Sequence, residues 1–291
     1  MRWSTGDRGN IEDMRGRSGG GGMIPLGIGG IIVVGLLSMF TGIDFFSILG
    51  GGGGGGSNGP TSVGTSGRVT ASPGEEKTVD MVDAVARDVQ QTWQQKLGNR
   101  YEATKVVLFR DSIPSACGFA GAATGPFYCP GDHKVYLDLS FFDELQRRFG
   151  APGDFAQAYV LAHEFGHHVQ NITGIERGVR EQQRADPRNV NALSVRLELQ
   201  ADCYAGVWGH EAAQPGRAAK GEVELDPGDL EEALRAAAAI GDDRLQKLGT
   251  GRVMPEKFTH GTSEQRVNWF KRGFDTGDPR NCDTFGNAGT R

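Results

Sequence analysis

The sequence predicts an α+β domain, mainly helical with a small β-sheet, preceded by one transmembrane helix and a glycine-rich linker. Three observations lead to this prediction. Long segments after residue 150 repeat apolar residues every three or four positions, short segments before them alternate apolar and polar residues, and an uncharged run near the N-terminus is followed by polyglycine. With 291 residues, 37% apolar and 23% charged, the chain suits one sizeable domain with appendages and not a multispanning membrane protein.

The uncharged run, Met23–Ile43, is long enough to cross a bilayer, and its glycines and single proline are tolerable in a membrane helix. A secretory signal peptide is the alternative, but the run is longer than a typical signal core and no A-x-A-like cleavage site follows it. A buried core helix is a weaker alternative, because the flanking polyglycine would leave such a helix nothing to pack on.

The flanks of this run predict its orientation. Arginines precede it, and no lysine or arginine follows it before Arg68, so the positive-inside rule places residues 1–22 in the cytoplasm. The preceding arginines are Arg2, Arg8, Arg15 and Arg17. We therefore expect a single-pass protein of the cell membrane, with a flexible linker over residues 44–71 and an extracytoplasmic domain over residues 72–291.

The elements of the domain follow from periodicity and capping residues. A helix begins near Val79, and two strands follow it. Ser140 is expected to cap a short helix, with Asp143 at the capping-box position. The strands are expected at residues 103–110 and 133–140, and further helices at 155–173, 190–213, 227–247 and, capped by Ser263, 264–274, with a polar connection at 180–189.

Four cysteines, all beyond the uncharged run, predict two disulfides in an extracytoplasmic domain, with three possible connectivities. Pairing Cys117 with Cys129 is the local choice and would close the loop "CGFAGAATGPFYC". Pairing Cys203 with Cys282 would then tie the C-terminal tail to the helix at 190–213. The alternative is four free cysteines that serve as small core residues.

A metal site is indicated by "HEFGHHVQ", which lies within the helix at 155–173. His163 and His167 are four positions apart, so on a helix their imidazoles converge on one ion. Glu164 is turned by about 100° around the helix axis, where its carboxylate can take a proton from water at the metal. His168 points off that face and is excluded as a ligand. The alternative, a helix with a few exposed histidines, fits poorly with the apolar character of the rest of the segment.

A hydrolytic zinc site needs a third protein ligand and one open position. Glu198 and Asp202 are four positions apart on the helix at 190–213 and share one face. Glu198 would bind the metal, and Asp202 would accept a hydrogen bond from a liganding histidine. The alternative for this acidic pair is a solvated helix face, and His210 is a competing third ligand. No histidine stands where an HExxHxxGxxH motif requires one, so that class is excluded.

Three segments, "HEFGHHVQ", "ELQADCYAGVW" and "FTHGTSEQRVNWF", together with the N-terminal run and the polyglycine, resemble the neutral zinc metallopeptidase family of bacteria over essentially the whole chain. The resemblance implies a zincin-like fold of the gluzincin kind, with HExxH followed by ExxxD. It also implies that His163, His167 and Glu198 bind Zn²⁺, that Glu164 is the general base, and that Asp202 supports a ligand.

The segment "THGTSEQR" is also similar to the T-H-P…R segment of membrane-associated gluzincins, with glycine in place of the proline. His260 or Arg266 is therefore a candidate to stabilise the oxyanion of the tetrahedral intermediate. The alternative is that Arg266 pairs with an acidic residue and His260 caps a loop.

The expected function is a membrane-anchored peptidase that hydrolyses peptide bonds with a zinc-activated water and Glu164 as general base. The strand at 133–140 is a candidate edge to which an extended peptide or protein substrate adds. The alternative function is a zinc-stabilised, non-catalytic binding or scaffold module of the cell envelope. A net charge of −5, without a basic cluster, argues against nucleic acid as a partner.

Overall fold

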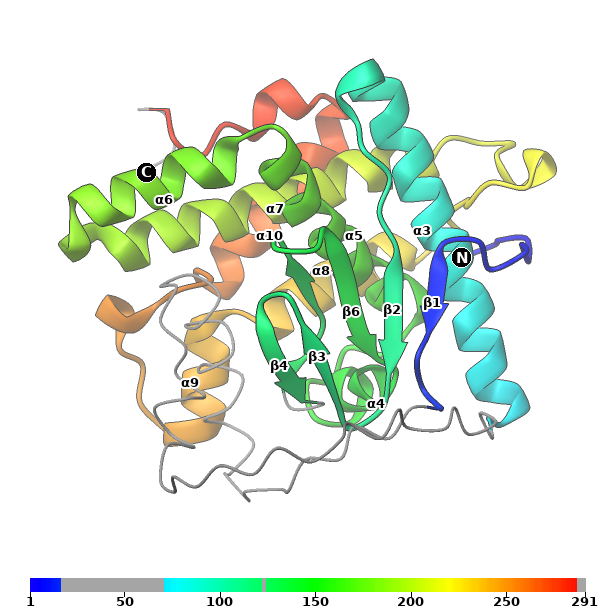
Figure 1. The fold of residues 1–291 in the computed structure, drawn as a ribbon, viewed down its shortest axis with the longest axis horizontal. Helices are drawn as coiled ribbons and strands as arrows, with labels where there is room; N and C mark the ends of the chain where they lie inside the picture. The colour runs from blue at the N-terminus through cyan, green and yellow to red at the C-terminus, as the bar shows by residue number, and fades with distance from the viewer. Residues whose placement is uncertain (17–70, 122–123, 287–291) are drawn as a thin grey trace, which may run out of the picture.

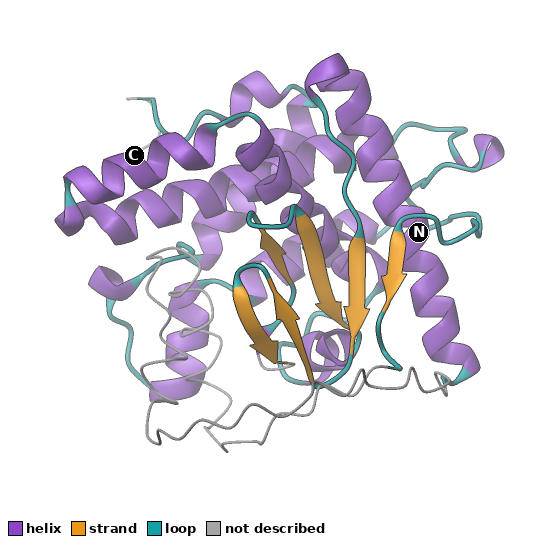
Figure 2. Ribbon diagram, in the orientation of Figure 1, coloured by secondary structure: helices purple, strands orange, loops and turns teal. Residues whose placement is uncertain are grey.

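The computed structural model describes residues 1–16, 71–121 and 124–286, which form a small sheet with helices packed against it (Figure 1). Most strands precede residue 140 and most helices follow it, as expected for the α+β class (Figure 2). The strands are β1 (Ile11–Asp13), β2 (Val106–Phe109), β3 (Ser112–Ser115), β4 (Gly118–Gly121), β5 (Phe127–Cys129) and β6 (Lys134–Asp138). The helices are α3 (Pro73–Leu97), α4 (Ser140–Arg147), α5 (Asp154–Ile172), α6 (Ile175–Ala185), α7 (Val190–Ala212), α8 (Asp229–Ala239), α9 (Asp242–Thr250) and α10 (Ser263–Thr276).

The main sheet has the strand order β1–β2–β6–β5, with β1, β2 and β6 parallel and β5 antiparallel at one edge. Side chains of a strand alternate between the two faces of a sheet. Val106 and Leu108 belong to the large core shared with the helices, whereas Val107 and Phe109 belong to a second cluster that includes the β3–β4 hairpin. Because both faces are covered, β2 is buried along its whole length.

The edge of the sheet differs from the prediction. We expected the strand at 133–140 to be a free edge for a substrate, and this is wrong, because β6 pairs with β2 on one side and with β5 on the other. The outer strand on this side is β5, which the sequence analysis left inside the cysteine loop. Its three residues are all buried.

Two predicted helical regions also differ. The expected polar connection at 180–189 is largely helical, because Ile175 and Val179 of α6 pack on Leu193 and Leu197 of α7. The expected helix at 227–247 is divided into α8 and α9 at Gly241, where a Cβ atom would overlap Ser263.

The capping residues of two helices differ from the expected ones. The helix α10 is capped by Thr262, whose side chain forms a capping box with Gln265, so Ser263 is its first residue and not its cap. The helix α4 begins at Ser140, but its N-cap is Leu139 and no side-chain hydrogen bond caps it.

Two glycines allow α7 and α10 to cross at very close distance. A Cβ atom at Gly206 of α7 would overlap the carbonyl group of Phe270, and a Cβ atom at Gly273 of α10 would overlap the carbonyl group of Cys203. Such overlap is forbidden at native packing density. The crossing therefore fixes α10 against the helix that carries Glu198.

Both disulfides are present in the pairing that the sequence favoured. The bond between Cys117 and Cys129 joins the β3–β4 turn to β5. The bond between Cys203 and Cys282 joins α7 to the short helical turn that follows α10. The second bond therefore strengthens the contact between α7 and α10.

The N-terminal residues are part of the same fold. Residues 1–16, which the sequence analysis assigned to a separate cytoplasmic segment, include β1, and this strand pairs with β2 from Ile11 to Asp13. The predicted transmembrane helix at 23–43 and all but the last residue of the linker at 44–71 lie outside the described residues. Within the described part of the chain, no helix is both long and apolar enough to span a bilayer.

Candidate metal centre and active site

The histidines and the acidic pair lie on α5 and α7, which approach each other closely. A Cβ atom at Gly166 of α5 would lie 3.0 Å from both the Cα and the carbonyl oxygen of Ala201 on α7. This separation is tighter than ordinary van der Waals contact, so a glycine is needed for the observed approach. The face of α5 that carries His163 and His167 is thereby held against the face of α7 that carries Glu198.

The three predicted ligands converge on one point. The Nε2 atom of His163 lies 3.1 Å from Nε2 of His167 and 3.1 Å from Oε2 of Glu198. The Nε2 atom of His167 lies 3.5 Å from the other oxygen of Glu198. One ligand atom from each residue lies within 4.8 Å of the other two. A single ion can therefore contact all three side chains.

The second nitrogen of each imidazole is held by a hydrogen-bond acceptor. The Nδ1 atom of His163 lies 2.9 Å from Oδ1 of Asp202, and Nδ1 of His167 lies 2.9 Å from Oε1 of Gln170. Each Nδ1 therefore carries a hydrogen and donates it. In the neutral ring this leaves the lone pair on Nε2, which is the nitrogen that faces the common point.

The charges around this point favour a cation. Burial by itself would raise the pKa of Glu198, but the nearby histidines His167, His260 and His163 hold it well below its usual range. Burial alone would lower the pKa of His163, yet the carboxylate of Asp202 raises it to about 9.

One oxygen of Glu198, Oε1, is buried and accepts no hydrogen bond from the residues that the structure describes. An anionic carboxylate of this kind, facing the Nε2 atoms of two imidazoles, fits a divalent cation. Two imidazole nitrogens and one carboxylate are a donor set that zinc commonly takes. The residues present therefore fit Zn²⁺.

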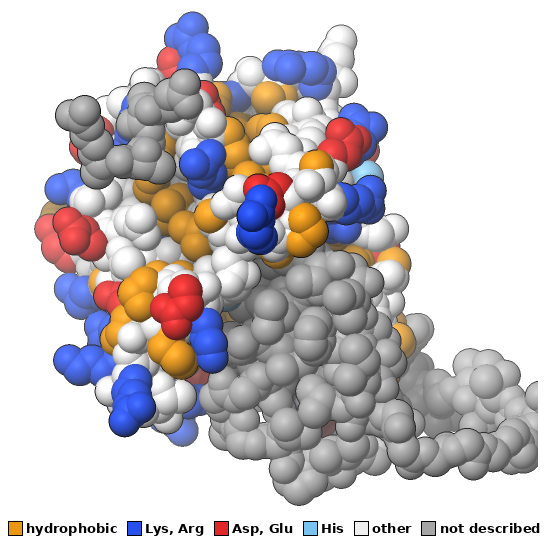
Figure 3. All heavy atoms as spheres, turned by 90° about the vertical axis from the view of Figure 1, so that its left-hand side faces the viewer, with side chains coloured by type: hydrophobic (Ala, Val, Ile, Leu, Met, Phe, Trp, Pro, Cys, Tyr) orange, Lys and Arg blue, Asp and Glu red, His pale blue; other side chains and the backbone are white. Residues whose placement is uncertain are grey.

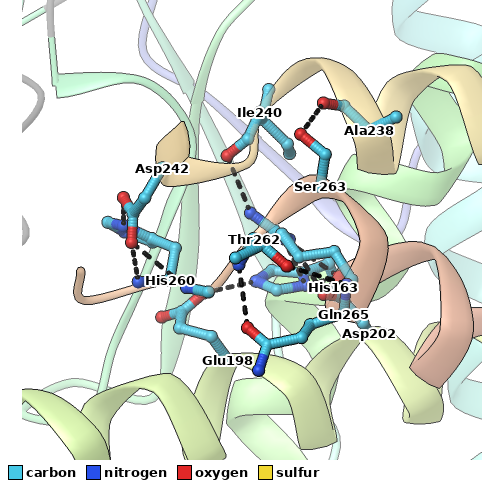
Figure 4. A network of polar contacts seen from close by, with 12 residues as sticks. His163, Glu198, Asp202, Ala238, Ile240, Asp242, His260, Thr262, Ser263 and Gln265 are labelled. Carbon is cyan, nitrogen blue, oxygen red and sulfur yellow. Dashed lines mark hydrogen bonds and ion pairs between the residues drawn. The ribbon is translucent and has the colours of Figure 1, made fainter. Parts of the chain in front are cut away.

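Asp202 is the centre of a buried polar network behind the ligands (Figure 4). Arg266 donates to both of its oxygens, from Nε over 2.9 Å and from Nη2 over 2.9 Å. The hydroxyl group of Tyr159 donates a further, short hydrogen bond to Oδ1. Of the two interpretations of Arg266, the geometry therefore favours the one in which it pairs with an acidic residue.

Glu164 lies beside the ligands and lines the same cavity, with 8% of its surface exposed. Burial raises the pKa of its carboxyl group above the usual range, although the charges of His167 and His163 act in the opposite direction. The backbone N–H of Tyr128 in β5 also acts to lower the pKa of this carboxyl group. Glu164 is therefore held next to the ligands without being one of them.

His260 projects its imidazole toward Glu198 from the loop before α10 (Figure 4). Its Nδ1 atom lies 3.1 Å from Oδ1 of Asp242, and the other oxygen of Asp242 accepts the backbone N–H groups of Thr259, His260 and Gly261. Its Nε2 atom is buried and has no hydrogen-bond partner within the described chain. The ring is thus fixed on one side and presents an uncommitted nitrogen to the cavity.

The remaining candidate histidines lie elsewhere. His168 donates from Nε2 to the carbonyl of Glu102 and accepts from the hydroxyl of Tyr128 at Nδ1, and burial lowers its pKa to about 4. His210 is twelve residues from Glu198 on α7, or about 18 Å along the helix, and its Nδ1 donates to the carbonyl of Phe274. The structure therefore does not bring His210 to the ligands.

Sequence reasoning missed Gln170, Tyr159 and Asp242. Gln170 and Tyr159 could have been identified from their spacing. Gln170 is three positions after His167 and Tyr159 is four positions before His163, so both lie on the helix face that the two histidines share. Asp242 had no local signal, since it is eighteen positions before His260 and reaches it only through the turn between α8 and α9.

Two packed helices bring a His–His–Glu cluster together, with a further carboxyl group beside it, and form a candidate metal site whose donor set is one that zinc hydrolases use. The chain belongs to the family described as "Putative neutral zinc metallopeptidase", which it matches over residues 1–285. The family name thus agrees with the metal that the donor set fits.

The family has members in distant bacteria. The chain is 47% identical over 301 residues to "Uncharacterized protein YpfJ" of Escherichia coli K12, a match that covers 99% of this chain and 100% of that protein. It is 45% identical over 211 residues to "Uncharacterized protein Rv2575" of Mycobacterium tuberculosis H37Rv, covering 71% of this chain and 70% of that protein. No solved structure matches the chain.

Proposed function

We propose that this chain is a zinc-dependent peptidase whose metal is held by His163, His167 and Glu198. The observation that carries the proposal is the convergence of these three donors in a cavity that also contains the carboxyl group of Glu164. Three protein donors leave a tetrahedral ion one position for a reacting group, as hydrolytic zinc sites require. The family description supports the same activity.

When bound, zinc supplies a Lewis acid that polarises the peptide carbonyl group and makes water more acidic. Glu164 accepts the proton of the attacking water on its carboxylate and passes that proton to the nitrogen of the departing amine. Because burial raises the pKa of Glu164, its carboxyl group gives up the proton at a higher pH than an exposed glutamic acid would. This suits a group that must both accept and return a proton.

His260 is placed to act on the carbonyl oxygen of the scissile bond. Asp242 holds Nδ1, so the ring turns Nε2 toward the cavity, and in the imidazolium form this nitrogen carries a hydrogen that it can donate. A donor at that position stabilises the oxyanion of the tetrahedral intermediate, an effect worth about 3 to 4 kcal/mol where such donors have been removed. Arg266 acts through Asp202, which orients His163, and does not need to contact the substrate.

The alternative function is a zinc-stabilised module without catalysis. A closed site with four protein ligands would favour it, and His210, which the sequence offered as a competing ligand, is bonded to Phe274 instead. The two disulfides support a site of action outside the cytoplasm, because disulfides persist in oxidising compartments. A peptide or protein in that compartment is the proposed substrate.

The test is the Glu164→Gln variant, with zinc content and hydrolysis of an unfolded protein measured on the same sample. We expect stoichiometric zinc, an unchanged melting temperature and a loss of hydrolysis of roughly a hundredfold or more, because the proton acceptor is gone. Glu102→Gln, at a carboxylate whose side chain is 68% exposed, is the matched control and should keep full activity. Equal hydrolysis by the two variants would remove Glu164 from the mechanism.

A further inference from the structure

We propose that the substrate of this site carries an uncharged, aliphatic side chain next to the bond that is cleaved. This inference rests on the proposed peptidase function. The cavity beside the ligands has a volume of about 110 Å³, and its walls away from the ligands are apolar. The apolar side chains in these walls include Phe141, Phe149, Val160, Leu197, Ile240 and Leu245. Such a recess takes up an apolar group in preference to water.

The charged residues in the cavity wall have partners within the protein. Arg266 is bonded to Asp202, and Glu176 is bonded to Arg180. The other charged groups in the wall are the ligands, Glu164 and His260. Apart from these groups at the reacting centre, the described residues that line the recess offer an acidic or basic substrate side chain no uncommitted partner, which is strongly unfavourable.

The size of the recess narrows the choice further. An apolar cavity of roughly 150 Å³ accommodates benzene, so about 110 Å³ suits leucine, isoleucine, valine or methionine better than tryptophan. Val160 lies one helical turn before Glu164 on α5, so the apolar wall begins about 6 Å from the residue that we place at the reacting bond. The occupant is therefore a side chain adjacent to the scissile bond.

The test measures binding to the zinc-loaded Glu164→Gln variant, which is expected not to cleave its ligand. Capped pentapeptides differ only at one residue beside the central bond, which is Leu, Trp, Asp, Lys or Gly, and calorimetry gives their Kd values. We expect the Leu peptide to bind at least tenfold more tightly than the Gly, Asp and Lys peptides, since burying a leucine side chain is worth that factor or more. The Trp peptide should bind more weakly than the Leu peptide.

A pair of variants on α9 tests whether the preference for Leu arises at this recess. Leu245 lines the cavity, whereas Leu248 on the same helix is 60% exposed. Apolar side chains also reach the surface elsewhere on the face shown in Figure 3, between scattered basic and acidic ones. Adding Leu245→Arg to Glu164→Gln should remove the preference for Leu and raise the relative affinity of the Asp peptide, and Leu248→Arg should change neither.

The outcomes separate the two proposals. If no peptide binds, the proposed peptidase function fails. If peptides bind but Leu has no advantage over Gly, Asp or Lys, the apolar specificity is wrong while the peptidase function stands. The peptide series alone decides this, even if Leu245→Arg does not fold.

The N-terminal segment supports a second, independent inference: we infer that residues 1–16 and residues 71–286 lie on the same side of any membrane. The strand β1 is hydrogen-bonded into the sheet beside β2. Asn10 accepts the N–H of Val106 at 2.9 Å, and Met14 donates to the carbonyl of Leu108 at 2.8 Å, so the pairing is bonded at both ends. A single membrane crossing between residue 16 and residue 71 would separate the two partners.

The arginines of this segment have partners in the domain. Arg15 has only 5% of its surface exposed and forms ion pairs with Glu75 and Glu76 of α3 at 2.8 and 3.0 Å. Arg8 also pairs with α3, and Arg2 pairs with Glu224 at 2.8 Å. These are three of the four arginines that suggested a cytoplasmic N-terminus. Ion pairs with the domain account for these arginines. They are therefore no longer an argument for a cytoplasmic N-terminus by the positive-inside rule.

Polar side chains inside the interface support the same placement. Asn10 donates to the buried carboxylate of Asp83 and accepts a hydrogen bond from Gln90, both on α3. Removing the segment would leave these buried groups without partners, which is costly. The family match also begins at residue 1, so the segment belongs to the region that the family shares.

The test compares two single-cysteine reporters, Thr5→Cys in the segment and Leu248→Cys in the domain, both at exposed positions. All four native cysteines are in disulfides, so each variant has one free thiol. Intact cells that express the full chain are treated with a membrane-impermeant maleimide, and labelling after permeabilisation gives the total thiol. We expect the two reporters to label to the same fraction of their totals. Labelling of one thiol and protection of the other in intact cells would overturn the inference.

Discussion

The interaction between Asp202 and Arg266 gives the sharpest prediction about this site. Asp202 is fully buried and Arg266 is 2% exposed, so replacing Asp202 by Asn leaves a buried guanidinium group without its anion. Breaking one side of a buried ion pair costs about 3 to 5 kcal/mol. In a domain of this size each kcal/mol lowers the Tm by roughly 2 to 4 °C, so Asp202→Asn should melt roughly 6 to 20 °C below the parent protein.

The same substitution should weaken zinc binding for a different reason. Asn at position 202 still offers an oxygen to Nδ1 of His163, but without the negative charge that supports this imidazole as a ligand. Loss of such a partner lowers metal affinity by roughly 10- to 100-fold. Stability and affinity therefore fall together in the single variant, and a second substitution is needed to separate them.

The double variant Asp202→Asn/Arg266→Met removes the unpaired charge and keeps the weakened support of His163. Stability is measured by thermal and urea unfolding in the presence of a chelator, and zinc affinity by competition with a chromophoric chelator. We expect most of the lost stability to return and the zinc affinity to stay low. If the double variant is as unstable as Asp202→Asn, or if its zinc affinity recovers as well, the assignment of Arg266 to Asp202 is wrong.

Three further predictions test the packing, the third ligand and the orientation of His260. Gly166→Ala should destabilise the fold by about 1 to 3 kcal/mol in urea unfolding and weaken zinc binding, because the added Cβ atom meets the backbone of α7. Gly178→Ala is the control, because a Cβ atom there meets nothing within 4 Å. It should be neutral or stabilise the fold by up to about 1 kcal/mol. Glu198→Ala should lose stoichiometric zinc in elemental analysis, whereas Glu211→Ala on the same helix should keep it. Full zinc content in both variants would place the third ligand elsewhere. Asp242→Asn should lower kcat by roughly a hundredfold at unchanged zinc content, because the ring of His260 is no longer held. In the double variant with His260→Ala, Asp242→Asn should cause no further loss of kcat. An additive loss would contradict the role of Asp242 as a positioning residue.

Much of the site was accessible from the sequence because helical spacing converts directly into geometry. The four-residue interval between His163 and His167 places both rings on one face of a helix, and the same interval relates Glu198 to Asp202. The structure finds the first three around one point and the fourth behind them. The close approach of the two helices occurs at Gly166, which meets Ala201.

Other features were hidden because they depend on residues distant in the sequence. The strand β1 has three residues and no pattern of its own, and it exists because β2 offers a parallel edge. The helix α6 is polar in sequence and is stabilised by one narrow apolar contact with α7. The break at Gly241 follows from the position of Ser263, which no local pattern indicates.

The sequence by itself therefore determined the class of fold, the ligand-bearing helices and the chemical type of the metal site, since these depend on intervals of three or four residues within one helix. Only the tertiary structure decided that Arg266 supports Asp202, that His260 is held by Asp242, that β6 is interior to the sheet and that residues 1–16 pack on the domain. Except for the pairing of β5 with β6, each of these is a contact between elements that are separated along the chain. Such contacts depend on how whole elements pack and bury their charges, and the spacing of residues within one element does not reveal that packing.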